Sequence, residues 1–325
     1  MSWRAHATQR FQSLNLNFVV DIPRFLAKLS NQLFDDPAEA RAFCDRLWFP
    51  DTFPPFPPTI AWVKPKPEIW EGDSFVPLPP LTWQPPWVDR LQKPLKPGRH
   101  PFHEAGYFYC LDTSSVFAAA VLTHPAIRTQ FPQPIVLDVC AAPGGKSIMA
   151  WRSLQPRHLY CNEVVGKRLG MLHSNLKRCG LLGTATEILH QDPQTLVENF
   201  AQTIEVAIVD APCSGQSLLA KGEKNPGCFH PAQINKNANR QKRILGHTAP
   251  LIKLGGYLAY MTCTYSLEEN EKVMNWFLRH FPDFIPVEIP ALSSHQSPLN
   301  DRPCYRLFPT QNLGAGAFTS LFVRD

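Results

Sequence analysis

The sequence predicts an α/β protein with a mostly parallel sheet, helices on both faces and an antiparallel last strand. Three observations support this class. From about residue 103 onward, short apolar runs alternate with segments of helical periodicity, which is the pattern of right-handed βαβ units. The first such run leads directly into a compact loop of small residues, CAAPGGK. The last run, GAFTSLFVRD, follows no helix, so we expect it to pair antiparallel.

Composition limits the class of protein. The chain has 325 residues, 44% hydrophobic and 18% charged, which suits one large α/β domain with an extension. The net charge of +5 permits a polyanionic partner without requiring one. Nine cysteines occur at irregular spacing with no C-x-x-C pair, so we expect free thiols, no metal site and a reducing compartment. No run is long enough to span a membrane, and MSWRAHATQRFQSLNLNF lacks a signal-peptide core. We therefore expect a cytoplasmic monomer.

The N-terminal part divides into a helical and a proline-rich segment. Residues 22–47 predict helices with Phe25, Leu26, Leu29 and Leu33 on one face. Residues 50–97 hold nearly half of the 33 prolines, which favours irregular or edge-strand structure. A flexible linker is one interpretation. A small packed subdomain is the other, and it is favoured by four tryptophans in the segment: Trp62, Trp70, Trp83 and Trp87. We expect an extension over 1–100 and the α/β domain over 101–325.

The remaining elements follow in order. Residues 107–124 predict a short strand and a helix that begins near Asp112. The predicted strands are 135–140, 158–164, 184–192, 206–213, 257–265 and 316–325. The predicted helices are 146–154, 166–180, 234–256 and 270–280, with Gly180 ending the second and Gly255-Gly256 ending the third.

The first loop predicts a ligand site, because ligands of such sheets bind beyond the carboxyl ends of the strands. Small side chains allow close approach of the ligand, and the following helix begins with unpaired N–H groups. The loop fits neither G-x-x-x-x-G-K-[ST] nor G-x-G-x-x-G. Glu163 ends the second strand and Asp192 the third, where they can meet a ribose and an adenine. A nucleoside cofactor without phosphate, S-adenosylmethionine, fits better than a nicotinamide cofactor. Each carboxylate could instead be a solvated strand end.

Two cysteines follow apolar strands at the same predicted edge. Cys213 lies in VDAPCSG and Cys263 in TCTYSLEENE. A single cysteine there would more often be buried and inert, but a pair beside a methyl-donor site suits cytosine C5 chemistry. A thiolate that adds to C6 makes C5 nucleophilic, C5 takes the methyl group and loses its proton, and the thiol leaves. Asp210 could bond the N3/N4 edge of the base.

Taken together, CAAPGGK, NEVVGKR, HQD, DAPCSG and TCTYSLEENE closely resemble the RNA (cytosine-5)-methyltransferases of the RsmB/Nop/Sun type. The resemblance covers about residues 102–325, including GYFYCLDTSS and GAFTSLFV. It implies a Rossmann-like S-adenosylmethionine-dependent methyltransferase fold. It also implies Cys263 as nucleophile and Cys213 as the residue that assists release, whereas DNA cytosine methyltransferases attack with the P-C cysteine.

The resemblance further implies a set of cofactor contacts. Asp210 would touch the methionine moiety or the base, and Arg168 matches the family arginine that follows Glu163. The implied cofactor-binding residues are Cys140, Ala141, Ala142, Pro143, Gly144, Gly145, Lys146, Glu163, Arg168, Asp192 and Asp210.

The expected partner is RNA, with ribosomal RNA first and tRNA second. Lys93, Lys96 and Arg99 lie beside aromatic residues, and Lys221 matches a basic family position, so these cations are candidates for RNA contact. Solvated lysines and arginines are the alternative. The family's R-x-N segment is replaced here by FPPFPPTIAWVK, which leaves RNA docking by the N-terminal part open. A catalytically silent RNA-binding or assembly factor is the alternative function.

Overall fold

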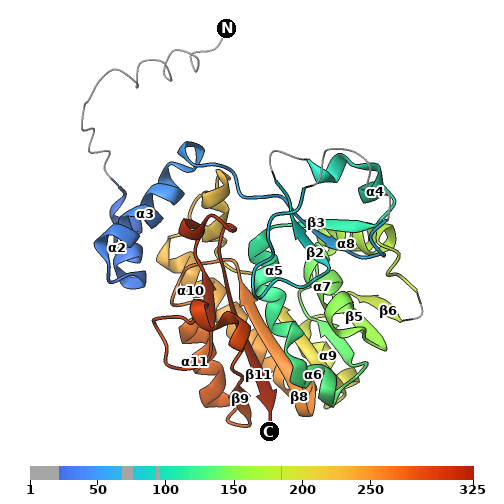
Figure 1. The fold of residues 1–325 in the computed structure, drawn as a ribbon. Helices are drawn as coiled ribbons and strands as arrows, with labels where there is room; N and C mark the ends of the chain where they lie inside the picture. Colours follow the sequence, from blue (N-terminus) through green and yellow to red (C-terminus); the bar gives the residue numbers. More distant parts are fainter. Residues whose placement is uncertain (1–21, 68–75, 93–95, 184) are drawn as a thin grey trace, which may run out of the picture.

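The computed structural model describes residues 22–67, 76–92, 96–183 and 185–325. Its main feature is an eight-stranded sheet in the order β10-β11-β8-β7-β4-β5-β6, with β9 paired to β11 (Figure 1). The strands β4 to β8 are parallel, and β11 pairs antiparallel with β8. The expected α/β class and antiparallel last strand are therefore confirmed. The strands are β4 (Ile135–Asp138), β5 (His158–Asn162), β6 (Thr186–Leu189), β7 (Ile204–Asp210), β8 (Ile252–Thr262), β9 (Phe284–Pro286), β10 (Tyr305–Leu307) and β11 (Ala317–Arg324).

Helices cover both faces of this sheet because side chains alternate along each strand. Val136 of β4 packs in the core beneath α5, α7 and α8, whereas the next residue, Leu137, packs in the opposite core beneath α9, α10 and α11. The helices are α5 (Thr113–Ala119), α6 (Pro125–Gln130), α7 (Gly145–Leu154), α8 (Gly166–Arg178), α9 (Pro193–Phe200), α10 (Pro231–Thr248) and α11 (Glu271–His280). Asp112 accepts a hydrogen bond from Ser114 N at 2.8 Å and begins α5 as predicted.

The predicted end of the long helix at Gly255-Gly256 is wrong. The helix α10 ends at Thr248, a 3₁₀ turn (Ala249–Leu251) that contains Pro250 follows, and β8 begins at Ile252. Gly255 lies inside β8 with φ +75°. There β8 has extra residues relative to β7, because Ile204 pairs with Ile252 but Val206 pairs with Tyr257. The two glycines Gly255 and Gly256 therefore form a bulge in β8 instead of ending a helix.

The described part of the proline-rich segment is packed, as the tryptophans predicted. β1 (Thr59–Trp62) pairs antiparallel with β2 (Val88–Arg90) and with β3 (Phe108–Leu111). Trp62 and Trp83 are buried, whereas Trp70 lies outside the described residues. The short helix α4 (Pro101–Glu104) precedes β3. This small sheet takes strands from both sides of residue 100, where the sequence predicts the domain boundary.

The first described helices lie on the opposite side of the molecule from the small sheet (Figure 1). α2 (Arg24–Leu33) and α3 (Pro37–Trp48) bury Leu26, Leu33 and Phe43 against Tyr265 and Phe308 of the large domain. Within the described ranges, no helix is both long and apolar enough to cross a membrane.

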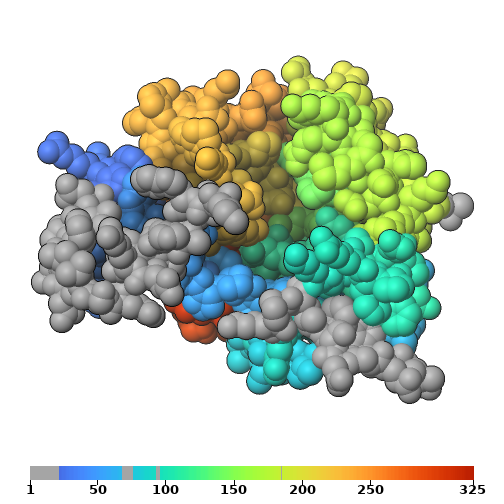
Figure 2. All heavy atoms as spheres, turned by 90° about the horizontal axis from the view of Figure 1, so that it is seen from above, coloured from blue at the N-terminus to red at the C-terminus, as the bar shows by residue number. Residues whose placement is uncertain are grey.

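The sheet direction defines one functional edge. β11 runs toward the C-terminus at the bottom of Figure 1, so the parallel strands end at the top, between α2 and α3 on one side and the small sheet on the other. Seen from that edge, the surface is hollowed between the segment that leads into α10 and the segment of α7 and α8 (Figure 2).

Candidate active site

A cavity of about 430 Å³ opens at the carboxyl ends of the parallel strands. It brings together Ala142 and Pro143 of the first loop with Asp210, Cys213 and Cys263. These residues are far apart in the sequence and meet because β4, β7 and β8 are neighbours in the sheet. The sequence placed them on one edge, and the structure places them in one cavity.

The two cysteine sulfurs are in contact. Cys213 Sγ and Cys263 Sγ lie 3.2 Å apart, and the backbone N–H of Cys263 points at Cys213 Sγ across 3.4 Å. The hydrogen bond between the thiols lowers the pKa of Cys263 and raises that of Cys213. Burial further raises the pKa of Cys213. Of the two thiols, Cys263 is therefore the one whose ionisation is favoured, and Cys213 is the one whose ionisation is disfavoured.

A partly buried ion pair lies beside Cys263. Lys146 Nζ, at the start of α7, lies 2.9 Å from Asp210 Oδ2 at the end of β7. Burial lowers the pKa of Lys146, but the charge of Asp210 and the hydrogen bond to it outweigh burial, so the pKa is raised. The ammonium in turn lowers the pKa of Cys263, against the opposing effect of Asp210. Lys146 therefore remains charged and offsets part of the larger effect of the Asp210 carboxylate, which raises the pKa of Cys263.

The loop that carries Cys213 is held by buried side chains. Glu269 accepts hydrogen bonds from Ser214 N at 2.9 Å and from Gln241 Nε2 at 3.0 Å. The Gln241 amide also donates to Pro212 O at 3.0 Å. Ser214 Oγ lies 2.7 Å from Thr264 Oγ1, so the strand ends of both cysteines are tied together. The sequence analysis missed Glu269 and Gln241, and only their position beneath the loop reveals their role.

The first loop has the compact form that its small residues predict. Gly144 has φ +113°, which an L side chain rarely adopts, and directly precedes α7. Ser147 donates to Asp138 Oδ2 at 2.7 Å, and burial raises the pKa of Asp138 to about 7. Burial also raises the pKa of Cys140 well above its usual value, so Cys140 is an inert thiol rather than a second nucleophile.

Glu163, directly after β5, and Arg168 of α8 connect the end of β5 to the first loop. Glu163 Oε1 accepts a hydrogen bond from Val165 N at 2.8 Å, and Arg168 Nη1 lies 3.1 Å from Glu163 Oε2. Arg168 also donates to the carbonyl of Ala142 and lines the cavity. Glu163 Oε2 is buried and accepts no hydrogen bond of good geometry from the described residues. This oxygen has acceptor capacity for a ligand hydroxyl.

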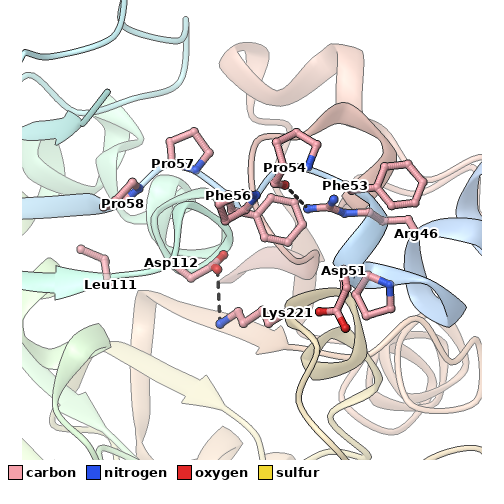
Figure 3. Close-up of a pocket in the computed structure, with 13 residues that line it drawn as sticks. Arg46, Asp51, Phe53, Pro54, Phe56, Pro57, Pro58, Leu111, Asp112 and Lys221 are labelled. Atoms are coloured by element: carbon pink, nitrogen blue, oxygen red, sulfur yellow. Dashed lines mark hydrogen bonds and ion pairs between the residues drawn. The ribbon is translucent and has the colours of Figure 1, made fainter. Parts of the chain in front are cut away.

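Other predicted site residues lie farther from the sulfurs. Asp192 follows β6, is exposed, and accepts a hydrogen bond from Gln194 N at 3.0 Å at the start of α9. Lys96 and Arg99 are exposed near the small sheet, and Lys93 lies outside the described residues. Lys221 is not in the cysteine cavity. It ends the 3₁₀ turn η4 (Gln216–Lys221) and pairs with Asp112 Oδ2 at 3.2 Å in a neighbouring cavity (Figure 3).

The donor set fits a nucleoside-type ligand that carries an amino acid group. Small loop residues leave room near the backbone, Glu163 Oε2 can accept from a hydroxyl, and the Lys146–Asp210 pair offers one charge of each sign. The two sulfurs in contact beside them, one with a lowered and one with a raised pKa, suit nucleophilic attack followed by proton transfer.

A comparison with protein families identifies the greater part of the chain. Residues 129–323 match the family model described as 16S rRNA methyltransferase RsmB/F. The chain is 31% identical over 200 residues to a ribosomal RNA small subunit methyltransferase F from Psychromonas ingrahamii. The aligned region covers 61% of this chain and 41% of that protein. It is 28% identical over 250 residues to the protein of the same name from Serratia proteamaculans, with 75% and 48% covered. The chain spans less than half the length of these relatives.

Solved structures resemble the whole described fold. A methyltransferase homologue protein from Pyrococcus horikoshii has a TM-score of 0.69 at 22% identity, over 93% of this chain and 99% of that one. The structure of NSun6 from the same organism, solved with SFG, also has a TM-score of 0.69, at 19% identity over 93% and 98%. At these identities the likeness establishes the fold.

Proposed function

Because the chain belongs to the 16S rRNA methyltransferase RsmB/F family, we propose that it methylates RNA at cytosine C5 with S-adenosylmethionine as methyl donor. The observation that carries this proposal is the contact between Cys213 and Cys263, 3.2 Å apart, in the cavity beside the first loop. Methylation of an exocyclic nitrogen or a ribose hydroxyl needs no such pair. Cytosine C5 does, because it becomes nucleophilic only after a thiolate adds to C6.

The cofactor is held by the first loop, Cys140 to Lys146, with further contacts from Glu163, Asp192 and Asp210. Glu163 accepts from the ribose hydroxyls, and Arg168 fixes the loop carbonyl of Ala142. When bound, S-adenosylmethionine supplies an electrophilic methyl group that C5 can take up. Glu163 Oε2, buried without a good hydrogen-bond donor among the described residues, supports the ribose contact.

Cys263 is the nucleophile, because it is the sulfur whose pKa is lowered. Its thiolate forms the S–C6 bond, and the electron pair of the C5–C6 double bond becomes available at C5 to bond the methyl group. Asp210, partly exposed in the cavity, accepts from the N4 amino group and orients the base. Loss of the C5 proton then restores the double bond, and the S–C6 bond breaks to return the thiolate.

Cys213 assists this last stage. Its pKa is raised first by the hydrogen bond to Cys263 and also by the negative charge of that sulfur. Once Cys263 is bonded to C6 its charge is gone, so Cys213 becomes easier to deprotonate. After the Cys213 thiol has released its own proton to solvent water, its thiolate can receive the C5 proton, 3.2 Å from the sulfur that has to leave.

The partner we propose is RNA with an unpaired or flipped-out cytosine. Ribosomal RNA is the first candidate, in agreement with the names of the relatives, and tRNA is the second. Lys96, Arg99 and Lys221 are exposed cations that can follow the backbone. A silent RNA-binding factor would need neither a lowered pKa at Cys263 nor the Lys146–Asp210 pair.

Bisulfite sequencing of total RNA from cells with and without the gene tests the proposal. We expect a single cytosine to lose its protection when the gene is absent, which would identify the RNA. Unchanged protection at every cytosine, together with no 5-methylcytidine after incubation of the purified protein with S-adenosylmethionine and unmodified RNA, would overturn the proposal.

A further inference from the structure

A second groove borders the candidate active site and is lined by aromatic side chains. Phe25 of α2 and Trp48 of α3 are 46% and 43% exposed. Together with Leu219 and Phe229, they line a space of about 620 Å³ whose lining is mainly apolar. The rings of Phe25 and Phe229 lie 4.8 Å apart at 30°. Exposed rings of this size on a groove wall are unusual for a protein surface that contacts only water.

The groove adjoins the cysteine cavity. Asn225, Pro226 and Cys228 line both spaces, so the segment 225–228 is their common wall. Asn225 is fixed by hydrogen bonds to the carbonyls of Ser214 and Gly215, at 2.8 and 2.9 Å, directly after Cys213. An elongated ligand bound at Cys263 can therefore extend across the segment 225–228 to the aromatic groove.

The charge around the groove favours an anionic ligand. Lys224 and His230 line it, and none of the described lining residues is a carboxylate. Glu223 precedes Lys224 but does not line the groove. Lys28, on the same face of α2 as Phe25, is exposed. α10, whose first residue borders the groove, carries the exposed cations Lys236 and Arg240 and no acidic residue.

We propose that this groove binds the nucleobases of single-stranded RNA that flank the target cytosine. Trp48, Phe25 and Phe229 stack on the bases, and Lys224 and Lys28 contact the phosphates. The inference deepens the proposed function, on which it rests: the substrate is an unpaired segment rather than one base flipped from an intact helix. A groove lined by rings and cations without carboxylates suits bases linked by phosphates, whereas an apolar protein partner would gain nothing from the cations.

The test measures binding of fluorescein-labelled single-stranded oligocytidylate, on the order of ten nucleotides long, to the full chain. Trp48→Leu and Phe25→Leu each remove a ring but keep an apolar side chain. We expect each to weaken binding about 5- to 150-fold, the range that one lost stacking contact corresponds to. Trp48→Phe should restore most of the affinity, which a purely structural role for a large side chain would not predict. Leu254→Ala, which shortens a 65% exposed side chain near the start of β8, is the matched control and should change nothing.

A second probe separates bases from phosphates. An oligonucleotide of abasic ribose units carries the same phosphate charges but no nucleobases. It should bind more weakly than oligocytidylate, and Trp48→Leu should not change its affinity. Equal loss of affinity for both probes, or wild-type affinity in both leucine variants, would overturn the inference. Dimerisation that Trp48→Leu abolishes without any change in RNA binding would assign the groove to a second copy instead.

The outcomes also separate this inference from the proposed function. Wild-type methylation with no dependence of RNA binding on Trp48 or Phe25 refutes the groove and leaves the function. Base-dependent binding through Trp48 in a protein that methylates no RNA refutes the function and leaves the groove.

Discussion

At the scale of residues, the main feature of the candidate site is the difference between two neighbouring cysteines. Cys213 and Cys263 line the same cavity, and their Sγ atoms lie 3.2 Å apart. Burial raises the pKa of both thiols, but the hydrogen bond between them lowers the pKa of Cys263 and raises that of Cys213. This difference agrees with the roles that the sequence resemblance implies for the two cysteines.

Replacement of the nucleophile tests this assignment. We expect Cys263→Ala to abolish methyl transfer, because no other described thiol in the cavity has a lowered pKa. Binding of S-adenosylmethionine, measured by calorimetry, should persist, since the first loop is unchanged. Measurable turnover by the purified variant on a substrate RNA would contradict the role of Cys263.

Removal of the second cysteine has a different expected result. In Cys213→Ala the S–C6 bond should still form, but its breakage should slow, so that a covalent protein–RNA adduct accumulates. The adduct is visible as a shifted band on a denaturing gel and should be absent in the double variant Cys213→Ala/Cys263→Ala. A single variant that turns over normally and shows no shifted band would exclude the release role.

The pKa difference itself can be measured. Alkylation of Cys263 by iodoacetamide requires the thiolate, so in the wild type its rate should rise at lower pH than for an ordinary cysteine. Lys146→Met removes a charge that lowers the pKa of Cys263, so the rise should move to higher pH. Mass spectrometry of the alkylated peptide gives the profile. Superimposable profiles for the two proteins would show that Lys146 does not act on the thiol.

At the scale of elements, buried polar contacts hold the strand ends in place. Arg306 of β10 and Glu271 at the start of α11 are 3% and 1% exposed, with Nε and Oε1 2.6 Å apart. Arg306 also donates to the carbonyl of Tyr265 at 3.1 Å, two residues after Cys263. The pair thus joins the antiparallel edge of the sheet to the segment that carries the nucleophile.

Loss of this pair should be costly. Arg306→Ala leaves Glu271 buried without its cation, for which we expect a loss of about 3–5 kcal/mol in the free energy of unfolding. Urea unfolding measures it. The matched variant Arg324→Ala removes a partly exposed pair with Asp283, where the loss should stay below about 1 kcal/mol. Similar losses in the two variants would mean that burial does not set the cost.

At the scale of the whole molecule, the N-terminal helices are fixed to the catalytic part through aromatic packing. Phe43 is fully buried and its ring lies 4.9 Å from that of Tyr265. Trp48 ends the same helix, so the position of the aromatic groove depends on this packing.

Phe43→Ala should release α2 and α3 from the large domain. Loss of a buried phenyl ring lowers the free energy of unfolding by about 3–5 kcal/mol. We expect limited proteolysis to cleave the chain between residues 49 and 58 more rapidly than in the wild type. S-adenosylmethionine binding should persist, because the first loop lies elsewhere. Cleavage at the wild-type rate would show that other contacts hold the helices.

The sequence by itself determined the α/β class, the first loop and the pairing of two cysteines at one edge, because these follow from local periodicity and from motifs of a few residues. It misplaced the end of α10, because a glycine pair can end a helix or form a bulge, and only the pairing of β8 with β7 distinguishes the two. The lowered pKa of Cys263, the support of the Cys213 loop by Glu269 and Gln241, and the groove that Trp48 and Phe229 line depend on residues far apart in the chain. Burial and neighbouring charge arise only when those segments meet, so the tertiary structure alone decided them.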